Sequence, residues 1–236
     1  HNTYSFFSLY ANLDNFSFGE LPIPLIERTE SDRWIISKLN SLIKFVTKAY
    51  DEYEPTQAGR AIQDFVVDDL SNWYVRLNRK RFWKGEYNND KISAYQTLYS
   101  CIETVAKLSA PIAPFYSEQL YLDLNKVSKK DPASSVHISG FPVADEIAID
   151  LKLEERMKIA QDASSLVHSL RKKHMIKVRQ PLSKILIAVL NEDKRLQIAA
   201  VEDLIMSEVN VKEVQYIDDT SGVLVKKIKP NFKKLG

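Results

Sequence analysis

The sequence predicts a mainly α fold, in which an antiparallel helical bundle precedes a small α/β module. Through most of the first 125 residues, apolar residues recur every three or four positions, which is the period of an α-helix. The connections between these stretches are short, and short connections make neighbouring helices antiparallel. Three short runs with the composition of strands appear only after residue 146. We therefore expect a bundle at 1–125, a linker at 126–146 and an αβαββ module at 147–236.

The start of the bundle is predicted from its aromatic residues and its turn residues. A first helix is expected at about 3–10, and a loop with two prolines and a glycine follows at 13–30. Ser31 and Asp32 can cap a second helix, which is expected at about 33–53 because an apolar stripe runs along it at helical spacing.

The next helix is expected to be long and continuous. Pro55 breaks the preceding helix, Thr56 can cap the new one, and helical spacing continues to about Trp83. One face of this helix is apolar and is expected to point inward. Its residues are Ile62, Val66, Leu70, Trp73 and Leu77.

Two further helices complete the predicted bundle. Gly85 and two asparagines end the long helix, and Asp90 can cap a helix that continues to about Leu108. Two prolines interrupt the pattern before a last helix at about 115–124. The following stretch, at 126–145, combines Pro, Ser and Gly, which is typical of a linker.

The module after the linker alternates between helical and strand patterns. Helical spacing predicts a helix at 147–175, and the apolar run KILIAVL at 184–190 predicts a buried strand. A second helix is expected at about 193–208, an alternating strand at 211–217, and a last strand at 223–228.

Composition excludes several classes of protein. The 236 residues are 44% hydrophobic and 27% charged, which is enough apolar material for a packed core. The formal net charge is only +2, so any nucleic-acid site must be local. Cys101 is the single cysteine and is expected in the core, which excludes a disulfide within the chain. No apolar run approaches the roughly 18 residues that a membrane span needs.

The sequence offers no recognisable catalytic or metal site. Phosphate-binding glycine loops are absent, and no two of the four histidines stand four residues apart, as a metal site on a helix requires. His168 and His174 are six residues apart and fall on opposite faces of a helix. We therefore assign no catalytic residue, no metal ligand and no cofactor to this chain.

Residues 71–84, SNWYVRLNRKRFWK, form a basic and aromatic segment without acidic residues. At about 100° per residue, Asn72, Arg76, Arg79 and Trp83 fall close together on one face of the helix. Guanidinium groups can bind phosphates, and an indole can stack on an unpaired base. This face is therefore a candidate surface for a nucleic acid.

A structural role for the same residues stays open. Trp73 continues the apolar stripe and is expected in the core, and Trp83 could pack on a neighbouring helix. The arginines could pair with Asp64, Asp68 and Asp69 on adjacent turns of the helix.

Two more basic tracts lie in the second half of the chain, at 171–184 and 226–234. Acidic blocks at 145–155 and 202–219 alternate with them. This pattern predicts one basic face on a molecule of near-neutral charge, and ligand binding that weakens as salt increases.

Several motifs resemble one family of enzymes. HNTYSFFSLYANLDNF, DRWIISKLN, DDLSNWYVRLNRKRFW and LSAPIAPFYSEQLY are similar to the anticodon-binding helical bundle of class I aminoacyl-tRNA synthetases for isoleucine, valine and leucine. LRKKHMIKVRQPLSKILI, SEVNVKEVQYI and KPNFKKLG resemble the C-terminal region of isoleucyl-tRNA synthetases. The resemblance covers nearly all of residues 2–236.

The resemblance implies that the chain binds the anticodon stem-loop of isoleucine tRNA for a ligase that acts in protein biosynthesis. The HIGH and KMSKS motifs of the ATP-binding catalytic core are absent, so this fragment alone is expected to be inactive. ATP and magnesium would belong to the catalytic domain of the parent enzyme. A single cysteine excludes, within this chain, the four-cysteine zinc site of one branch of the family. We expect a cytoplasmic monomer with no DNA or membrane partner.

By resemblance, two motifs supply the candidate tRNA-binding residues. The bundle motif gives Asn72, Arg76, Arg79, Lys80, Arg81 and Trp83. The motif at the start of the module gives Arg171, Lys172, Lys173, Lys177 and Arg179. Three successive cations of one helix cannot all face the same RNA, so part of the bundle motif is expected to be structural. Two alternatives stay open: a helical protein-interaction scaffold, and the same region of a valine or leucine synthetase.

Overall fold

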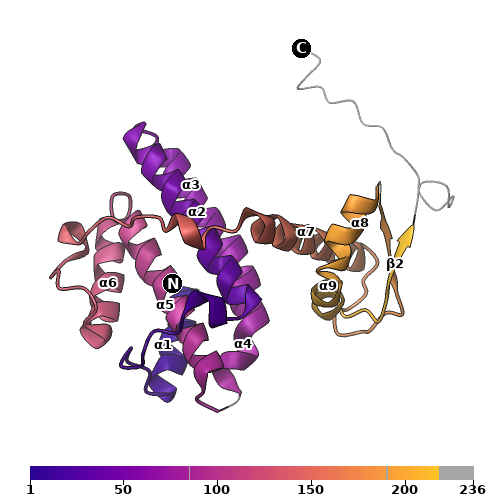
Figure 1. Ribbon diagram of the computed structural model, residues 1–236, viewed down its shortest axis with the longest axis horizontal. Coiled ribbons are helices and arrows are strands. Elements are labelled where there is room, and N and C mark those ends of the chain that lie inside the picture. Colours follow the sequence, from indigo (N-terminus) through magenta and orange to yellow (C-terminus); the bar gives the residue numbers. More distant parts are fainter. Residues whose placement is uncertain (85, 190, 218–236) are drawn as a thin grey trace. The chain divides into compact units, whose positions relative to one another are not determined.

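The computed structural model describes residues 1–84, 86–189 and 191–217, which form two compact units (Figure 1). The first unit, His1–Glu154, is a helical bundle, and the second begins at Glu155 and is a small α/β module. The predicted fold class is therefore confirmed. None of the described helices combines the length and the apolar character that crossing a membrane requires.

The first unit consists of helices with short connections. Its α-helices are α1 (Asn2–Leu13), α2 (Glu30–Asp51), α3 (Pro55–Asp64), α4 (Arg76–Trp83), α5 (Asn89–Ser109) and α6 (Pro114–Ser128). A π-helical segment, η2 (Phe65–Val75), joins α3 to α4. Short 3₁₀ turns lie at Leu25–Glu27, Val136–Ile138 and Glu146–Ala148.

Helix α5 is the centre of this unit, because residues on most sides of it are buried. The ring of Tyr95 in α5 lies 6.2 Å from that of Phe7 in α1, measured between ring centroids. It lies 4.8 Å from the ring of Phe16, in the loop after α1, and 5.2 Å from that of Phe82 in α4. Burying each such aromatic side chain contributes roughly 1.5–3 kcal/mol. The aromatic residues of the first helix and the end of α4 are thus held against one central ring.

Three helix starts differ from the predicted caps. In α3 the N-cap is Glu54, and Thr56, the predicted cap, lies inside the helix. Thr29 and Asn88 are the N-caps of α2 and α5, and the side chain of each accepts a backbone hydrogen bond within the first turn. Ser31, Asp32 and Asp90 lie inside the helices that they were expected to cap. Thr, Asn, Ser and Asp are all good N-caps, so a sequence that contains several in succession does not determine which one acts.

The long helix expected at about 56–83 is continuous but changes its pitch. The segment η2 is π-helical, with wider turns than an α-helix, and its buried residues are Phe65, Leu70, Trp73, Tyr74 and Val75. Of the predicted inward stripe, Ile62, Leu70 and Trp73 are buried, and Val66 is only half-buried. Leu77 is only half-buried, and Phe82 of α4 is buried in its place.

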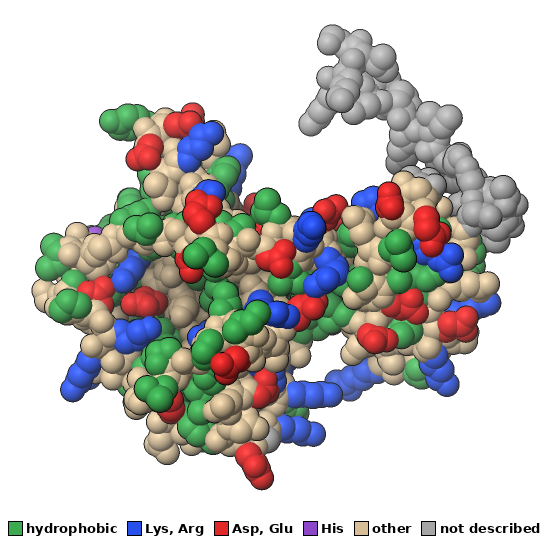
Figure 2. All heavy atoms as spheres, viewed as in Figure 1, with side chains coloured by type: hydrophobic (Ala, Val, Ile, Leu, Met, Phe, Trp, Pro, Cys, Tyr) green, Lys and Arg blue, Asp and Glu red, His purple; other side chains and the backbone are tan. Residues whose placement is uncertain are grey.

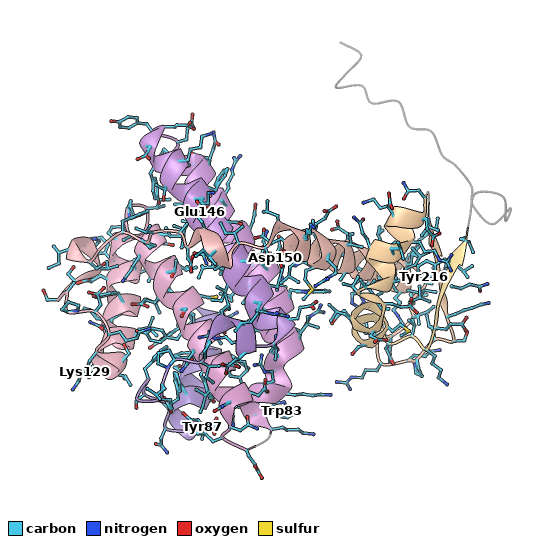
Figure 3. The ribbon with its side chains drawn as sticks, in the orientation of Figure 1. Trp83, Tyr87, Lys129, Glu146, Asp150 and Tyr216 are labelled. Carbon is cyan, nitrogen blue, oxygen red and sulfur yellow. The ribbon has the colours of Figure 1, made fainter. Side chains whose placement is uncertain are left out.

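The segment at 129–150, most of which was expected to be a linker, packs on the bundle as a strap. The backbone N–H of Val136 donates to the Glu118 carboxylate at 2.8 Å, and Lys107 pairs with Asp131 at 2.8 Å. The N–H of Asp150 donates to Ser37 of α2 at 2.8 Å, where the strap runs along that helix (Figure 3). A composition rich in Pro, Ser and Gly is the same for a free linker and for a segment that packs on the bundle. In the second case, side chains of the bundle form hydrogen bonds with the backbone N–H and C=O groups of the segment.

The second unit has the predicted alternation of helix and strand. Its elements are α7 (Leu151–Lys173), which begins in the first unit, β1 (Ile185–Ala188), α8 (Glu192–Ala199), α9 (Glu202–Val209) and β2 (Val214–Ile217). The strands are parallel, with Ile185 opposite Val214, so α8 and α9 form the crossover between them. The single helix expected at 193–208 is divided into these two helices. The strand expected at 223–228 lies outside the described residues.

Candidate nucleic-acid interface

Arg81 of α4 lies in the interior instead of facing a ligand. Its side chain is 14% exposed, and its guanidinium donates to both carboxylate oxygens of the fully buried Asp32 at 2.9 and 2.8 Å. It also pairs with Asp90 of α5 at 2.9 Å. The expectation that Arg81 contacts tRNA is therefore corrected: this arginine joins the starts of α2 and α5 to α4.

The buried carboxylate of Asp32 is satisfied by several donors. The hydroxyl of Tyr74 donates to it at 2.5 Å, and Ser93 of α5 donates at 3.3 Å. Burial raises the pKa of Tyr74 well above its ordinary value, and the negative charge of Asp32 adds to this effect. Burial opposes the charge of Arg81, but the hydrogen bonds and charge of Asp32 outweigh it, so the pKa of Arg81 is raised. The guanidinium of Arg81 therefore stays charged throughout the ordinary pH range.

Fixing Arg81 inward determines which residues of α4 face outward. Arg76, Arg79 and Lys80 are exposed, and so is Trp83, with 58% of its surface accessible. Trp83 lies at the C-terminal end of α4 (Figure 3), and the ammonium of Lys84 lies 5.6 Å from the centroid of its ring. The structure thus presents cations and an accessible indole together at this end of the helix.

The polar part of the predicted face borders a pocket. Asn72, Arg76 and Arg79 line it together with Asn2 and Phe6 of α1. Trp83 is not among the lining residues, so the face divides into a pocket and a separate aromatic end.

The structural alternative for this segment holds in part. Trp73 is buried, as predicted, and the guanidinium of Arg76 lies 5.7 Å from its ring centroid. Asp69 pairs with Lys38 of α2 at 3.4 Å. Arg81 takes its acidic partners from α2 and α5, and not from the adjacent turns of its own helix.

Arg171, in the second unit, is also an interior residue. It is 2% exposed, and its guanidinium donates to the backbone carbonyls of Lys177, Gln180, Val209 and Asn210 at 2.7–3.1 Å. The expectation that Arg171 touches tRNA is corrected, because the guanidinium is directed at the protein backbone.

The other cations of the module motif are on the surface. They surround the turn that follows α7 and are Lys172, Lys173, Lys177 and Arg179. Met175 in this turn has a positive φ of 54° and is exposed. The end of α7 and the turn after it therefore display four cations, and Arg171 holds the backbone of the turn from the inside.

Sequence reasoning missed the structural partner and one surface cation. Asp32 was interpreted as a helix cap, although an acid next to the apolar stripe of α2 could have indicated a buried ion pair. The surface cation is Lys84, the last residue of the basic segment. Because α4 ends at Trp83, Lys84 leaves the helix, and its ammonium lies over the indole of Trp83.

The remaining chemistry of the described residues is sparse. Over 1–84, 86–189 and 191–217, no three His, Cys, Asp or Glu side chains form a group that could hold a metal ion. Cys101 is buried in the core, as predicted, and burial raises the pKa of its thiol. Figure 2 shows acidic and basic side chains intermixed on the visible face of the first unit, which agrees with local basic sites instead of a uniformly positive surface.

A helical bundle with exposed arginine, lysine and tryptophan side chains at one helix end has the features of an RNA-binding module. Residues 32–186 match the family described as "Anticodon-binding domain of tRNA ligase", and the chain belongs to that family.

The curated relatives of this chain agree in their names. Proteins from Cytophaga hutchinsonii, Bacteroides thetaiotaomicron and Clostridium novyi are 70%, 59% and 43% identical over 235, 236 and 235 residues. Each match covers 100% of this chain and 20–22% of the relative, and each relative is named isoleucine–tRNA ligase. The resemblance found in the sequence is thus confirmed, and the chain spans about one fifth of the length of these relatives.

Proposed function

We propose that this chain binds the anticodon stem-loop of isoleucine tRNA as part of an isoleucine–tRNA ligase. The observation that carries the proposal is the family match over residues 32–186, which includes the whole of both basic motifs, 71–84 and 171–184. The parent enzyme would attach isoleucine to its tRNA with ATP and magnesium, in the cytoplasm and as a monomer. The present chain would contribute binding and no chemistry.

The first unit would hold the RNA through the outer face of α4. Arg76, Arg79 and Lys80 would bind phosphates, and Asn72 would add a hydrogen bond at the pocket. Trp83 would stack on a base that has left the helical stack. Because the major groove of an A-form helix is too narrow for side chains, bases are read where the loop is single-stranded.

The second unit would contact the RNA through the turn after α7. Lys172, Lys173, Lys177 and Arg179 would bind the phosphates of the stem or of the loop. That these cations and those of α4 lie against the same RNA stays a prediction. Its consequence is that variants from either unit weaken the same complex.

Competition between tRNAs tests the proposed ligand. In this experiment, fluorescently labelled isoleucine tRNA is mixed with the 236-residue chain, and unlabelled isoleucine, valine or leucine tRNA is then added as a competitor. We expect isoleucine tRNA to compete best, and an isoleucine tRNA with an exchanged anticodon to compete poorly. Better competition by valine or leucine tRNA would assign the chain to that specificity instead. Equal competition by all tRNAs would show that the chain grips the backbone without reading the anticodon.

A further inference from the structure

The side chain of Arg171 binds four backbone carbonyls from two separate segments. One end of the guanidinium donates to Lys177 and Gln180 in the turn after α7, at 3.1 and 2.9 Å. The other donates to Val209 and Asn210 at the end of α9, at 2.7 and 3.0 Å. The group therefore ties the turn to the C-terminus of a helix that is distant in sequence.

The charge of this buried guanidinium is stabilised by carbonyl dipoles. Two of its acceptors lie at the C-terminal end of α9, where the aligned peptide dipoles concentrate negative charge. A guanidinium carries its donors in a planar fork, and here the fork spans both segments. A lysine ammonium is a compact charge on a single atom, so it cannot reach all four oxygens in this geometry.

The turn from 174 to 180 has few other ties to its unit within the described part of the chain. The side-chain amide of Asn210 donates to the carbonyl of Val178 at 3.0 Å, on the same inner side as Arg171. Other backbone bonds near the turn are local, such as that from the N–H of Ile176 to the carbonyl of Arg171 at 2.9 Å. With the carbonyls of Lys177 and Val178 held inward, the side chains of Lys177 and Arg179 are exposed.

We propose that Arg171 is a positioning residue for RNA binding: it shapes the turn so that Lys177 and Arg179 face the ligand, and it does not touch the RNA itself. The proposal rests on the proposed function, because it explains how one of the two basic motifs is presented. It also gives a role to Arg171, a cation of this motif that is buried and therefore cannot contact a phosphate.

Arg171→Lys is the first test, because it keeps the positive charge and removes the planar fork. We expect it to weaken binding of isoleucine tRNA at least as much as Lys177→Ala does. The salt dependence should also become shallower, by about 0.7 in the slope of log affinity against log salt for each phosphate that the variant no longer binds. Adding Lys177→Ala and Arg179→Ala to Arg171→Lys should weaken binding little further, because the cations are already misplaced.

Asn210→Gly is a second variant that removes no charge. Glycine accepts the positive φ of 53° at this position, so only the hydrogen bond to Val178 is removed. We expect a smaller decrease in affinity in the same direction, with a shallower salt slope although every cation is still present. Lys158→Ala, an exposed cation of α7 paired with Asp162, is the control and should change neither quantity.

Hydrogen exchange separates positioning from general stability. In Arg171→Lys, the amides of Ile176 and Gln180 should exchange faster, whereas those of Ile185 and Val189, which donate between the strand segments, should stay protected. Faster exchange across the sheet as well would show that Arg171 supports the whole unit, and the proposal would be overturned. Wild-type affinity in Arg171→Lys, or full additivity with the alanine variants of the turn, would also overturn it.

The proposed function can fail separately. If Lys177→Ala and Arg179→Ala leave the affinity of the otherwise unchanged chain as it is, the turn is not part of the RNA site. In that case the exchange pattern still reports whether Arg171 shapes the turn, but its role in binding is refuted.

Discussion

At the scale of single residues, two arginines that sequence reasoning placed on the RNA surface are used by the fold internally. Arg81 and Arg171 each stand in a run of cations whose other members are exposed. Sequence spacing predicts that not all cations of a run share a face, but it does not say which one turns inward. The partners decide that, and Asp32 and the carbonyls of α9 are brought to them only by the tertiary fold.

Replacing Arg81 by alanine should destabilise the first unit by about 3–5 kcal/mol, because the carboxylate of Asp32 would remain buried without its charged partner. Urea unfolding followed by circular dichroism measures this change in the free energy of unfolding. Arg79→Ala, two residues away and exposed, is the matched control and should change it by less than about 0.5 kcal/mol. Equal stability of the two variants would mean that the ion pair with Asp32 contributes nothing to the fold.

Replacing Trp83 by alanine should weaken tRNA binding by about 1–3 kcal/mol, because a base can no longer stack on the indole. The fold should be unaffected, since more than half of the side chain is exposed. Fluorescence anisotropy with labelled tRNA measures the affinity. Phe115→Ala, which removes another highly exposed aromatic ring from α6, is the control and should bind normally. Unchanged affinity of Trp83→Ala would remove this residue from the site.

At the scale of elements, the sequence predicts which stretches are helical better than it predicts where helices turn their side chains. The helices of the bundle and the order of helices and strands in the described part of the module follow from apolar periodicity. The outward face of η2 and α4 also follows from about 100° per residue, since Asn72, Arg76, Arg79 and Trp83 are exposed. The inward face follows less well: this arithmetic places Leu77 in the core, whereas the structure buries Asn78 and Phe82 and leaves Leu77 half-buried.

The outer face of η2 and α4 should be necessary for binding as a unit. Arg76→Glu combined with Arg79→Glu should weaken tRNA binding by about 100-fold or more, since two charge-assisted hydrogen bonds of about 1.5–3 kcal/mol each are removed and repulsion is added. Titration with labelled tRNA measures the affinity. The helical circular dichroism and the melting temperature should stay close to those of the unchanged chain.

Lys126→Glu combined with Lys129→Glu makes the same change of charge on exposed residues at the end of α6 and serves as the control. If both double variants weaken binding equally, the effect comes from net charge and not from the face of α4. Unfolding by the arginine pair would show instead that these residues support the bundle.

At the scale of the whole molecule, composition excluded a disulfide framework and a membrane span, and the sequence motifs predicted the family. The modest net charge of +2 indicated local basic sites, and the exposed cations of both units are local. The strap at 129–150 was not predictable, because its contacts with Glu118, Lys107 and Ser37 join residues that are distant in sequence. Long-range partners of this kind leave no periodic signal in one sequence.

Salt dependence is the property by which the whole molecule can be classified. If the chain neutralises several phosphates, log affinity should fall linearly with log salt, by about 0.7–0.9 for each phosphate bound. Titrations of tRNA at several sodium chloride concentrations measure this slope. A complex held by an apolar interface, as in the alternative of a protein-interaction scaffold, should keep its affinity across the same range. A flat titration with tRNA would therefore favour the scaffold.

The eleven-residue π-helical stretch between α3 and α4 has a consequence for how this chain can vary. Deletion of a single codon anywhere within it would change the phase of everything downstream by the rotation of one residue about the axis. Phe82 would then take the place of Arg81, and the buried acid Asp32 would lose the guanidinium that neutralises it. Insertions and deletions should therefore be tolerated in the connecting loops of this bundle far more readily than in this one stretch.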